Sequence, residues 1–348
     1  MLITGRLNYD NGVTTYLHYL VKGLSNNNDI LLIAASLEAS SKFTFPNTVI
    51  KVIEELDYNK RNFYFFFKAV LKIFLLVLKF SPDIIHTNNH YTANIAGYSI
   101  KILSRKPKMI QTVHSDLSFK GTLKKYFADR YIFVNKHIMD NAIQRNSDLG
   151  KCSFLIYNGM KFDKKIYTKQ YDHERITITV ASRLSQSKGV HNVLISLGML
   201  PDEYKKRVRL VIAGSGEDET LLRSIARRTN IHVKFAGVVS DMQGLFCQTN
   251  IFIFSSIVDS FGYTWLEAIN FNCFLIISDY DGVEYLLEKD DNFLFYNKNS
   301  PFDLQKKIQL AIDMGDVIIS KAISLKQEVS RMYFADRMIN QTMDVYLL

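Results

Sequence analysis

The sequence predicts an α/β protein with two doubly wound, Rossmann-like domains. Apolar stretches typical of buried parallel strands alternate with amphipathic stretches typical of helices, and this alternation occurs twice along the chain. A chain of 348 residues is too long for one average domain and can bury two separate cores. A polar stretch, 161–175, lies between the two series and is the best candidate for a linker.

Each half of the chain contains five apolar stretches that we expect to form strands. In the first half they are 30–34, 83–86, 109–114, 131–134 and 154–157. In the second half they are 176–181, 209–213, 233–235, 251–254 and 274–278. Helices are expected between the later strands at 190–200, 220–228, 242–247 and 264–271, and again in a final stretch from about 303 to 348.

These elements divide the chain into three predicted parts. Residues 1–165 form the first domain, residues 166–330 form the second, and residues 331–348 form a C-terminal helix that crosses back to the first. Ligands of open α/β sheets bind outside the carboxyl ends of the strands. Two such domains facing each other therefore predict a central cleft lined by strand-end loops.

Charge is divided unevenly between the two halves. Residues 1–170 contain 24 Lys and Arg against 12 Asp and Glu, whereas the remainder contains 19 against 22. The net charges are about +12 and about −3. An anionic membrane surface or nucleic acid would attract the basic half. Because no nucleic-acid recognition motif is visible, we expect a membrane surface rather than nucleic acid.

The cysteine pattern, the N-terminal segment and the longest apolar run together indicate a cytoplasmic protein. Cys152, Cys247 and Cys273 are widely spaced and form no Cys-x-x-Cys or Cys/His cluster, so neither a disulfide framework nor a zinc site is expected. The chain does not begin with a basic region followed by an apolar core, so no signal peptide is expected. The longest apolar run, 63–80, is interrupted by three lysines and makes a poor transmembrane span.

The most informative segment is 259–267, Asp-Ser-Phe-Gly-Tyr-Thr-Trp-Leu-Glu, which follows the strand expected at 251–254. We expect a helix to begin near Tyr263 or Thr264. Backbone N–H groups and the helix dipole at such a start make a site for a diphosphate. Gly262 lets the backbone come close to this ligand.

Two acids flank this helix start. We place Glu267 within the first turn, where a carboxylate can accept hydrogen bonds from the vicinal hydroxyls of a ribose. Asp259 lies before the turn and can reach a sugar beyond the phosphates. The alternative is that Asp259 is an ordinary loop acid and that Glu267 only interacts favourably with the helix dipole.

A second segment, 182–189, follows the first strand of the second domain. Arg183 offers a fork of donors and Lys188 a point charge. Together they can neutralise a departing diphosphate, where negative charge develops in the transition state. The alternative is two solvated cations on a loop.

With these residues in place, the chain resembles glycosyltransferase family 4, a group of retaining enzymes with the GT-B fold. The family has a Glu-x7-Glu signature around Phe-Gly, which corresponds to Asp259 and Glu267 here, and a Gly-Arg-Leu…Lys-Gly segment, which corresponds to 182–189. Further matches follow in family order. They are Asp83-Ile84-Ile85-His86, Thr112-Val113-His114, Asn158-Gly159, Gly214-Ser215-Gly216 and Gly282-Val283-Glu284.

The resemblance implies a role for each matching residue. Arg183 and Lys188 bind the donor diphosphate, Glu267 holds the ribose, and Asp259 contacts the donor sugar beside the reacting carbon. His114 faces the donor sugar from the first domain, unless it is a structural histidine that bonds the loop backbone. The other implied donor-binding positions are Gly12 at the start of the first helix, the turn at Gly214, and the backbone of Gly262, Tyr263 and Thr264.

The implied activity is retaining, metal-independent transfer of a sugar from a nucleotide diphosphate to a glycan or lipid-linked glycan, in the synthesis of cell-surface polysaccharide or glycolipid. No cofactor and no metal are expected, and the enzyme is placed in the cytoplasm, peripheral to the inner face of the cytoplasmic membrane. Two alternatives stay open: an epimerase or phosphorylase of the same fold, and a nucleotide-sugar-binding subunit with weak activity or none. Two departures from the family pattern are Asp259, where Glu is usual, and Asn11 beside Gly12, where a glycine pair is usual.

Several other features carry weaker predictions. As a helix, 63–80 places its lysines on one face, and a basic amphipathic helix can lie at a membrane interface. We expect most of its apolar face to be core, its lysines to face water, and any membrane contact to involve 63–67. A second candidate patch spans 119–130. His86 and His90 are assigned equally to an acceptor site and to a structural role, and Asp279-Tyr280-Asp281 is interpreted as a turn rather than a metal site.

Overall fold

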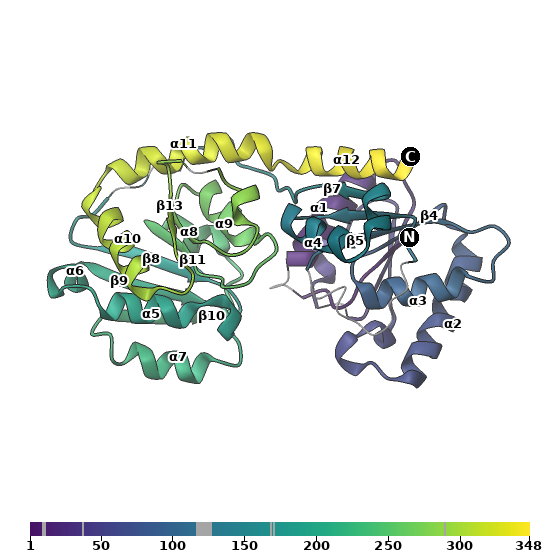
Figure 1. Cartoon of the computed structure of the whole chain (residues 1–348), viewed down its shortest axis with the longest axis horizontal. Coiled ribbons are helices and arrows are strands. Elements are labelled where there is room, and N and C mark those ends of the chain that lie inside the picture. The colour runs from purple at the N-terminus through teal and green to yellow at the C-terminus, as the bar shows by residue number, and fades with distance from the viewer. Residues whose placement is uncertain (9–11, 37, 116–126, 168, 170, 289) are drawn as a thin grey trace. The chain divides into compact units, whose positions relative to one another are not determined.

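A computed structural model describes residues 1–8, 12–36, 38–115, 127–167, 169, 171–288 and 290–348 (Figure 1). The chain forms two compact units. The first unit is Met1–Met160 with Tyr333–Leu348, and the second unit is Lys161–Met332. The crossings between the units lie five residues before the expected boundary at 165 and two residues after the one at 330.

The first unit contains a seven-stranded parallel sheet in the order β3-β2-β1-β4-β5-β6-β7. Its strands are β1 (Leu2–Ile3), β2 (Ile30–Ala34), β3 (Thr48–Val52), β4 (Ile84–Thr87), β5 (Lys108–Val113), β6 (Arg130–Phe133) and β7 (Ser153–Leu155). Its helices are α1 (Gly12–Leu24), α2 (Phe63–Phe80), α3 (His90–Ile100), α4 (Lys136–Arg145) and α12 (Ala335–Leu347). Strand order reverses between β1 and β4, the arrangement of a doubly wound sheet.

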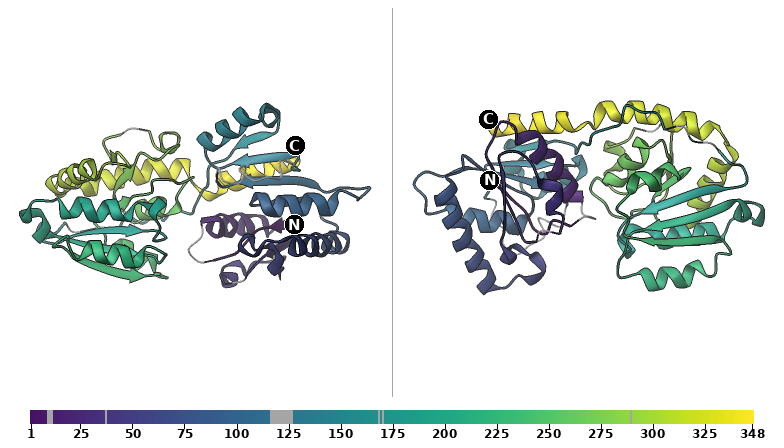
Figure 2. Two further views of the ribbon diagram at one scale, coloured as in Figure 1. Left: turned by 60° about the horizontal axis from the view of Figure 1, so that its bottom comes forward. Right: turned by 180° about the vertical axis from the view of Figure 1, so that it is seen from behind.

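The second unit contains a six-stranded parallel sheet in the order β10-β9-β8-β11-β12-β13. Its strands are β8 (Ile176–Ala181), β9 (Val208–Ala213), β10 (His232–Gly237), β11 (Ile251–Phe254), β12 (Phe274–Ser278) and β13 (Leu294–Tyr296). Its helices are α5 (Val190–Gly198), α6 (Asp202–Arg207), α7 (Glu219–Ala226), α8 (Met242–Cys247), α9 (Tyr263–Asn270), α10 (Pro301–Asp313) and α11 (Val317–Met332). Every residue of β8, β11 and β12 is buried, and helices cover both faces of the sheet (Figure 2).

All ten predicted strands overlap observed ones, so the prediction of two doubly wound sheets is confirmed. The apolar runs were sufficient because a parallel strand covered on both faces has no polar side. The strands missing from the prediction are β1, β3 and β13. β1 and β13 have two and three residues, too few for a pattern, and β3 is mostly exposed or half-buried at the edge of its sheet.

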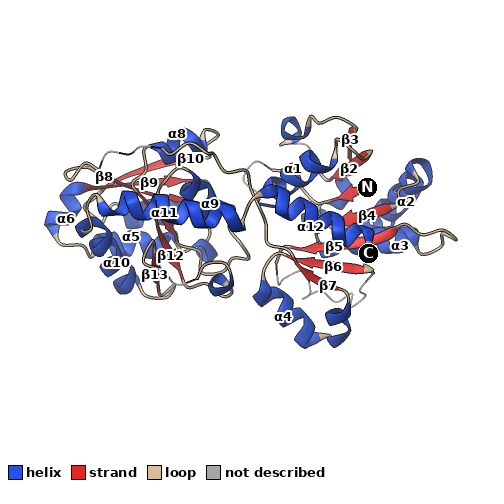
Figure 3. Ribbon diagram, turned by 90° about the horizontal axis from the view of Figure 1, so that it is seen from above, coloured by secondary structure: helices blue, strands red, loops and turns tan. Residues whose placement is uncertain are grey.

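The final stretch from 303 forms three helices, α10, α11 and α12, rather than one. α12 belongs to the first unit, where it packs on α1 and lies across the strands of the sheet (Figure 3). Polar side-chain contacts hold it there. His86 in β4 makes hydrogen bonds to the Tyr346 hydroxyl through Nδ1 at 2.6 Å and to Thr112 through Nε2 at 2.7 Å.

α2 begins and ends at the predicted residues, and the prediction that its apolar face is mostly core holds only in part. Asn62 caps its start by accepting a hydrogen bond from the Phe65 N–H at 2.7 Å. The buried residues of the helix are Ala69, Ile73 and Val77, which share one narrow strip. Four more apolar residues of α2 are half-buried and pack against the same core: Phe66, Val70, Leu76 and Phe80. Six other apolar side chains of the helix are more than half exposed.

Candidate functional site

The second sheet places two of the candidate segments side by side. Its strand order reverses between β8 and β11, which pair in parallel. The loops that follow these two strands therefore start side by side and lead in opposite directions, which makes this point a topological switch point. The loops are also bonded to each other: the Ile257 N–H donates to the Ser187 carbonyl at 2.8 Å, and the Ser255 hydroxyl donates to the Lys188 carbonyl at 2.7 Å. The two loops therefore form one structural feature.

Glycines permit these close approaches. Gly189 has a φ of +64°, and a Cβ there would lie 2.1 Å from the Ser255 carbonyl oxygen. Gly214 has a φ of +125°, and a Cβ there would lie 1.9 Å from the Ser182 carbonyl oxygen. Both positions exclude any other residue for a structural reason. The donor-binding role assigned to Gly214 stays a prediction, because the packing already accounts for the glycine.

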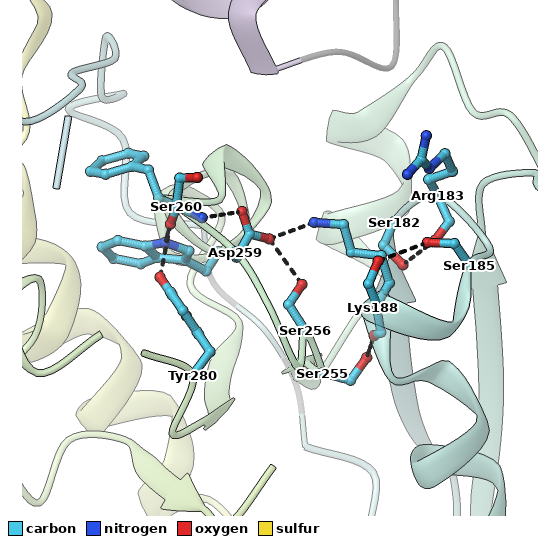
Figure 4. A network of polar contacts seen from close by, with 12 residues as sticks. Ser182, Arg183, Ser185, Lys188, Ser255, Ser256, Asp259, Ser260 and Tyr280 are labelled. Atoms are coloured by element: carbon cyan, nitrogen blue, oxygen red, sulfur yellow. Dashed lines mark hydrogen bonds and ion pairs between the residues drawn. The ribbon is translucent and has the colours of Figure 1, made fainter. Parts of the chain in front are cut away.

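Lys188 and Asp259 form an ion pair across the two loops (Figure 4). Lys188 Nζ lies 2.7 Å from Asp259 Oδ2, and the two side chains are 24% and 15% exposed. The Ser256 hydroxyl donates to the same Oδ2 at 2.9 Å, and the Ser260 N–H donates to Oδ1 at 2.8 Å. Three donors thus hold the Asp259 carboxylate in one orientation. Ser256 was not predicted as a site residue. In the sequence, only its position just after the strand β11 marks it as a candidate.

Arg183 is not part of this contact. It is exposed, and its guanidinium points away from the Lys188–Asp259 pair (Figure 4). The structure thus brings one of the two predicted cations to Asp259 and leaves the other at the surface.

α9 begins at Tyr263, within the predicted range, and Gly262 stands before it with a φ of +76°. A Cβ on Gly262 would lie 2.3 Å from Cζ of Phe254 in β11, so the turn needs glycine. Since Gly262 has no side chain to cap the helix, the start of α9 keeps the character of an anion site. Thr264, in the first turn, is half-buried.

The turn before α9 is anchored from within the core. The Phe261 carbonyl accepts hydrogen bonds from Trp265 Nε1 at 2.6 Å and from the Tyr280 hydroxyl at 3.1 Å. The side chains of all three residues are buried. This contact fixes the point where the loop from Asp259 meets the helix.

The prediction that Glu267 lies in the first turn of the helix is wrong. α9 has no acidic residue in its first turn, and Glu267 is the fifth residue of the helix, in its second turn. Its side chain is half-buried. Because the Cα–Cβ bonds of a helix tilt toward its N-terminus, the Cα–Cβ bond of Glu267 points toward the start of α9.

His114 follows β5 in the first unit. Its Nε2 lies 3.4 Å from Asn88 Oδ1, and its ring meets the Tyr16 ring edge-on at a centroid distance of 4.8 Å. Desolvation lowers the pKa of His114 to about 3, so the imidazole is neutral at pH 7. A neutral imidazole can donate or accept a hydrogen bond with a sugar hydroxyl, but it offers no positive charge.

The other candidate residues of the first unit are either structural or exposed at the surface. His86 is fully buried and tied to β5 and α12, which settles its structural role. Gly12 is exposed and begins α1, whereas Asn11 lies outside the described residues. Most of the patch at 119–130 also lies outside them.

The Asp279-Tyr280-Asp281 segment is a turn, with each carboxylate bonded to Lys298. The backbone N–H of Lys298 donates to Asp279 Oδ1 at 2.7 Å, and its ammonium pairs with Asp281. The segment runs into Gly282, which has a φ of +95°. Among the residues that the structure describes, no group of three or more His, Cys, Asp and Glu side chains could hold a metal ion.

Two family models match the chain, one for each half. Residues 10–164 match the model described as Glycosyltransferase Family 4, and residues 162–324 match the one described as Glycosyl transferases group 1. Two uncharacterized glycosyltransferases of Methanocaldococcus jannaschii are 24% identical over 88% of this chain and 87% of their own, and 22% identical over 76% and 75%.

Solved structures resemble the whole chain. HepE of Anabaena, in complex with UDP and glucose, has a TM-score of 0.78 at 16% identity and covers 99% of this chain and 98% of its own. Sucrose-phosphate synthase of Thermosynechococcus elongatus has a TM-score of 0.79 at 14% identity, with the same coverage. The apo form of the lipopolysaccharide outer core galactosyltransferase WaaB has a TM-score of 0.76 at 15% identity and covers 100% and 99%. At these identities the likeness shows a shared fold.

Proposed function

Since this chain belongs to glycosyltransferase family 4, and is a glycosyltransferase of the GT-B fold, we propose that it transfers a sugar from a nucleotide diphosphate to a glycan or lipid-linked glycan with retention of anomeric configuration. The observation that carries the proposal is the ion pair between Lys188 and Asp259, at the switch point of the second sheet and beside the uncapped start of α9. A cation, an acid and a helix start are the groups that a sugar diphosphate needs.

In this proposal the donor lies on the second unit. Its diphosphate occupies the start of α9 at the backbone of Gly262, Tyr263 and Thr264, and its ribose hydroxyls bond to Glu267. The turn at Gly214 belongs to this proposed set. Gly12 and His114, in the first unit, stay predicted donor-binding positions. HepE, which is similar in fold, binds UDP and glucose.

Donor binding requires Lys188 to change partner. Its ammonium is paired with Asp259 in the structure, and a diphosphate offers it a higher negative charge. After the exchange, Asp259 keeps the hydrogen bonds from Ser256 and from the Ser260 N–H. Its carboxylate therefore stays oriented and gains capacity to accept hydroxyls of the donor sugar.

Transfer then depends on stabilising the departing diphosphate. Lys188, Arg183 and the dipole of α9 supply positive charge where negative charge develops, in the role that a divalent metal plays elsewhere. Arg183 must rotate inward to take part. The anomeric carbon loses its bond to the phosphate oxygen and gains one to the acceptor oxygen on the same face, while the acceptor proton passes to the departing phosphate.

We propose a membrane-borne acceptor, in cell-surface polysaccharide or glycolipid synthesis, with the enzyme in the cytoplasm and peripheral to the membrane. Charge supports this: the first unit carries 21 Lys and Arg against 13 Asp and Glu, whereas the second carries 22 against 21. A basic surface is attracted to anionic lipids. WaaB, which is similar in fold, acts on the lipopolysaccharide outer core.

Three variants test the proposed donor site. Lys188→Ala and Glu267→Ala should lower sugar transfer at least about 100-fold, because each removes a group that holds the donor. Lys234→Ala is the matched control, since Lys234 is an exposed cation of β10. Transfer and hydrolysis are measured over a panel of nucleotide sugars, with melting temperatures to confirm folding. Near-native transfer by both site variants would overturn the assignment.

A further inference from the structure

The outer face of α2 is a continuous apolar stripe. Six side chains of this 18-residue helix are each more than half exposed. They are Phe63 (80%), Tyr64 (69%), Phe67 (54%), Leu71 (57%), Leu75 (54%) and Leu78 (52%). At ~100° per residue these positions fall within an arc of about 120°, and an 18-residue helix is ~27 Å long. We call these six residues the α2 stripe.

The stripe is separate from the part of α2 that packs in the core. Ala69, Ile73 and Val77 face inward, where the helix packs on α3. The Ser99 hydroxyl in α3 donates to the Val70 carbonyl at 3.0 Å, which fixes this packing. Large exposed apolar surfaces are rare on proteins that have no partner, so the stripe indicates a contact surface.

Positive charge borders the stripe. Lys68, Lys72 and Lys79 lie along one edge of it, at about 140–180° on the same helical wheel. Lys68 and Lys72 both pair with Glu55, at 2.9 and 2.7 Å. Burial alone would raise the pKa of this carboxyl, but the two ammonium groups outweigh it and lower the pKa to about 2. Two cations therefore share one carboxylate, and the edge keeps a net positive charge.

The charge extends beyond the helix. Residues 51–108 contain ten Lys and Arg against four Asp and Glu, and α2 itself contains no acid. Lys60 and Arg61 are exposed just before the helix, and Lys79 is exposed near its end. Ile102, two residues after the end of α3, is 78% exposed and follows the exposed Lys101.

We propose that the α2 stripe docks this protein on an anionic lipid bilayer, with α2 lying in the plane of the interface. An aromatic and aliphatic face bordered by cations is the composition of interfacial helices. In the described part of the chain, no helix is long and apolar enough to span a membrane. Contact with a second copy is less favourable, since two-fold pairing would bring two cation-rich segments together and α2 has no acid to answer them. The inference deepens the proposed membrane-borne acceptor by naming the surface that reaches the membrane.

Vesicle sedimentation tests the proposal with the full chain. Vesicles of phosphatidylcholine with 30% phosphatidylglycerol should bind the protein at low salt, and phosphatidylcholine alone should bind it at least about tenfold more weakly. Phe67→Gln with Leu71→Gln should lower the partition coefficient about tenfold or more, because two apolar side chains leave the interface. Leu221→Gln with Val317→Gln is the matched control, since both residues are exposed apolar side chains of the second unit.

A tryptophan at Phe67 reports insertion directly. The chain has one natural tryptophan, Trp265, which is fully buried in the second unit and gives a constant background. In Phe67→Trp, emission should shift to the blue on addition of anionic vesicles, and brominated lipid should quench it. Quenching requires the side chain to enter the acyl region, which attraction of charges alone does not produce.

The outcomes separate the proposal from its competitors and from the proposed function. Absence of vesicle binding by the natural chain, or equal binding by the stripe variant, would overturn it. A dimer that the stripe variant converts to a monomer, with no vesicle binding, would assign the stripe to a second copy instead. Stabilisation of the protein by a nucleotide sugar is measured on the same samples and should be equal in all of them, so failure of membrane docking leaves the donor site untouched.

Discussion

The two units share a doubly wound topology but place their polar side chains differently. In the first unit, His86, Thr112, Tyr16 and Tyr346 form a network of neutral groups that fixes α12 to the sheet, and all but the half-buried Tyr346 are fully buried. In the second unit, Lys188 and Asp259 form a charged pair that water reaches, at the switch point. Burial keeps His86 and Tyr16 neutral near pH 7. The second set is an ion pair that solvent reaches, so it is open to exchange with a charged ligand.

The electrostatics of the first network follow from this burial. Desolvation lowers the pKa of His86 to about 3 and raises the pKa of Tyr16 to about 12. Desolvation also raises the pKa of Tyr346 well above its ordinary value. A network whose members neither gain nor lose charge near pH 7 is suited to holding structure, not to binding an anion. The comparison of the two units shows that charged side chains exposed to solvent, more than hydrogen bonding itself, distinguish the candidate site.

The largest expected effect comes from the glycine that joins the two loops of the second unit. Gly189→Ala should abolish transfer and destabilise the protein by about 4 kcal/mol or more, because its Cβ would lie 2.1 Å from the Ser255 carbonyl oxygen. Gly237→Ala is the control: its φ is also +64°, but no atom lies within 4 Å of the added Cβ. We expect a cost of about 1 kcal/mol there. Equal melting temperatures and transfer rates in the two variants would show that the loops need not touch.

The next effect tests the network of the first unit. His86→Ala should destabilise the first unit by about 3 kcal/mol, because it leaves a cavity and removes one hydrogen-bond partner from each of the Tyr346 and Thr112 hydroxyls. Far-ultraviolet circular dichroism follows both units, whereas Trp265 fluorescence follows only the second. The dichroism midpoint in denaturant should fall while the stabilisation by nucleotide sugar at native conditions stays the same. His137→Ala, a half-buried histidine of α4, should change neither. A loss of donor binding in His86→Ala would remove the distinction between the units.

The sequence was enough to predict elements that depend on a local pattern of residues. It was not enough to predict contacts between residues far apart in the chain. Apolar runs were enough for ten strands and for both ends of α2. The contact of Lys188 with Asp259 joins residues 71 positions apart, and that of His86 with Tyr346 joins residues 260 apart. No local pattern announces either contact. The exposure of α2 was also unpredictable, because helical periodicity shows which residues share a face but not which face is covered.

The pH dependence of stability should also distinguish the first network. Unfolded histidine binds a proton below pH 6.5, whereas His86 and His114 stay neutral in the folded protein down to about pH 3. The unfolded state therefore binds more protons in this window, and the free energy of unfolding falls as pH falls from 6.5 toward 3. Between pH 6.5 and 5.5 the loss should be about 2 kcal/mol for the two histidines together. His86→Phe should show about half of this loss, and an unchanged slope in denaturation followed by circular dichroism would contradict the assignment.

The smallest effect concerns the partner exchange of Lys188. Asp259→Asn removes the charge that engages Lys188, so a nucleoside diphosphate alone should bind up to about tenfold more tightly, or about 1.4 kcal/mol. Turnover of the complete donor should fall, because the amide accepts sugar hydroxyls less well than a carboxylate. Calorimetry with UDP, GDP and ADP measures the first effect, and Asp281→Asn, whose carboxylate pairs with Lys298, is the control. Weaker diphosphate binding in Asp259→Asn would count against the exchange.

The most direct test of the donor site is a crystal structure of the protein with its nucleotide sugar bound. We predict both phosphates at the start of α9, beside the backbone of Tyr263 and Thr264. Lys188 Nζ should have left Asp259 and should lie about 3 Å from a phosphate oxygen. Phosphates bound elsewhere, or Lys188 still paired with Asp259 beside an occupied site, would contradict the account.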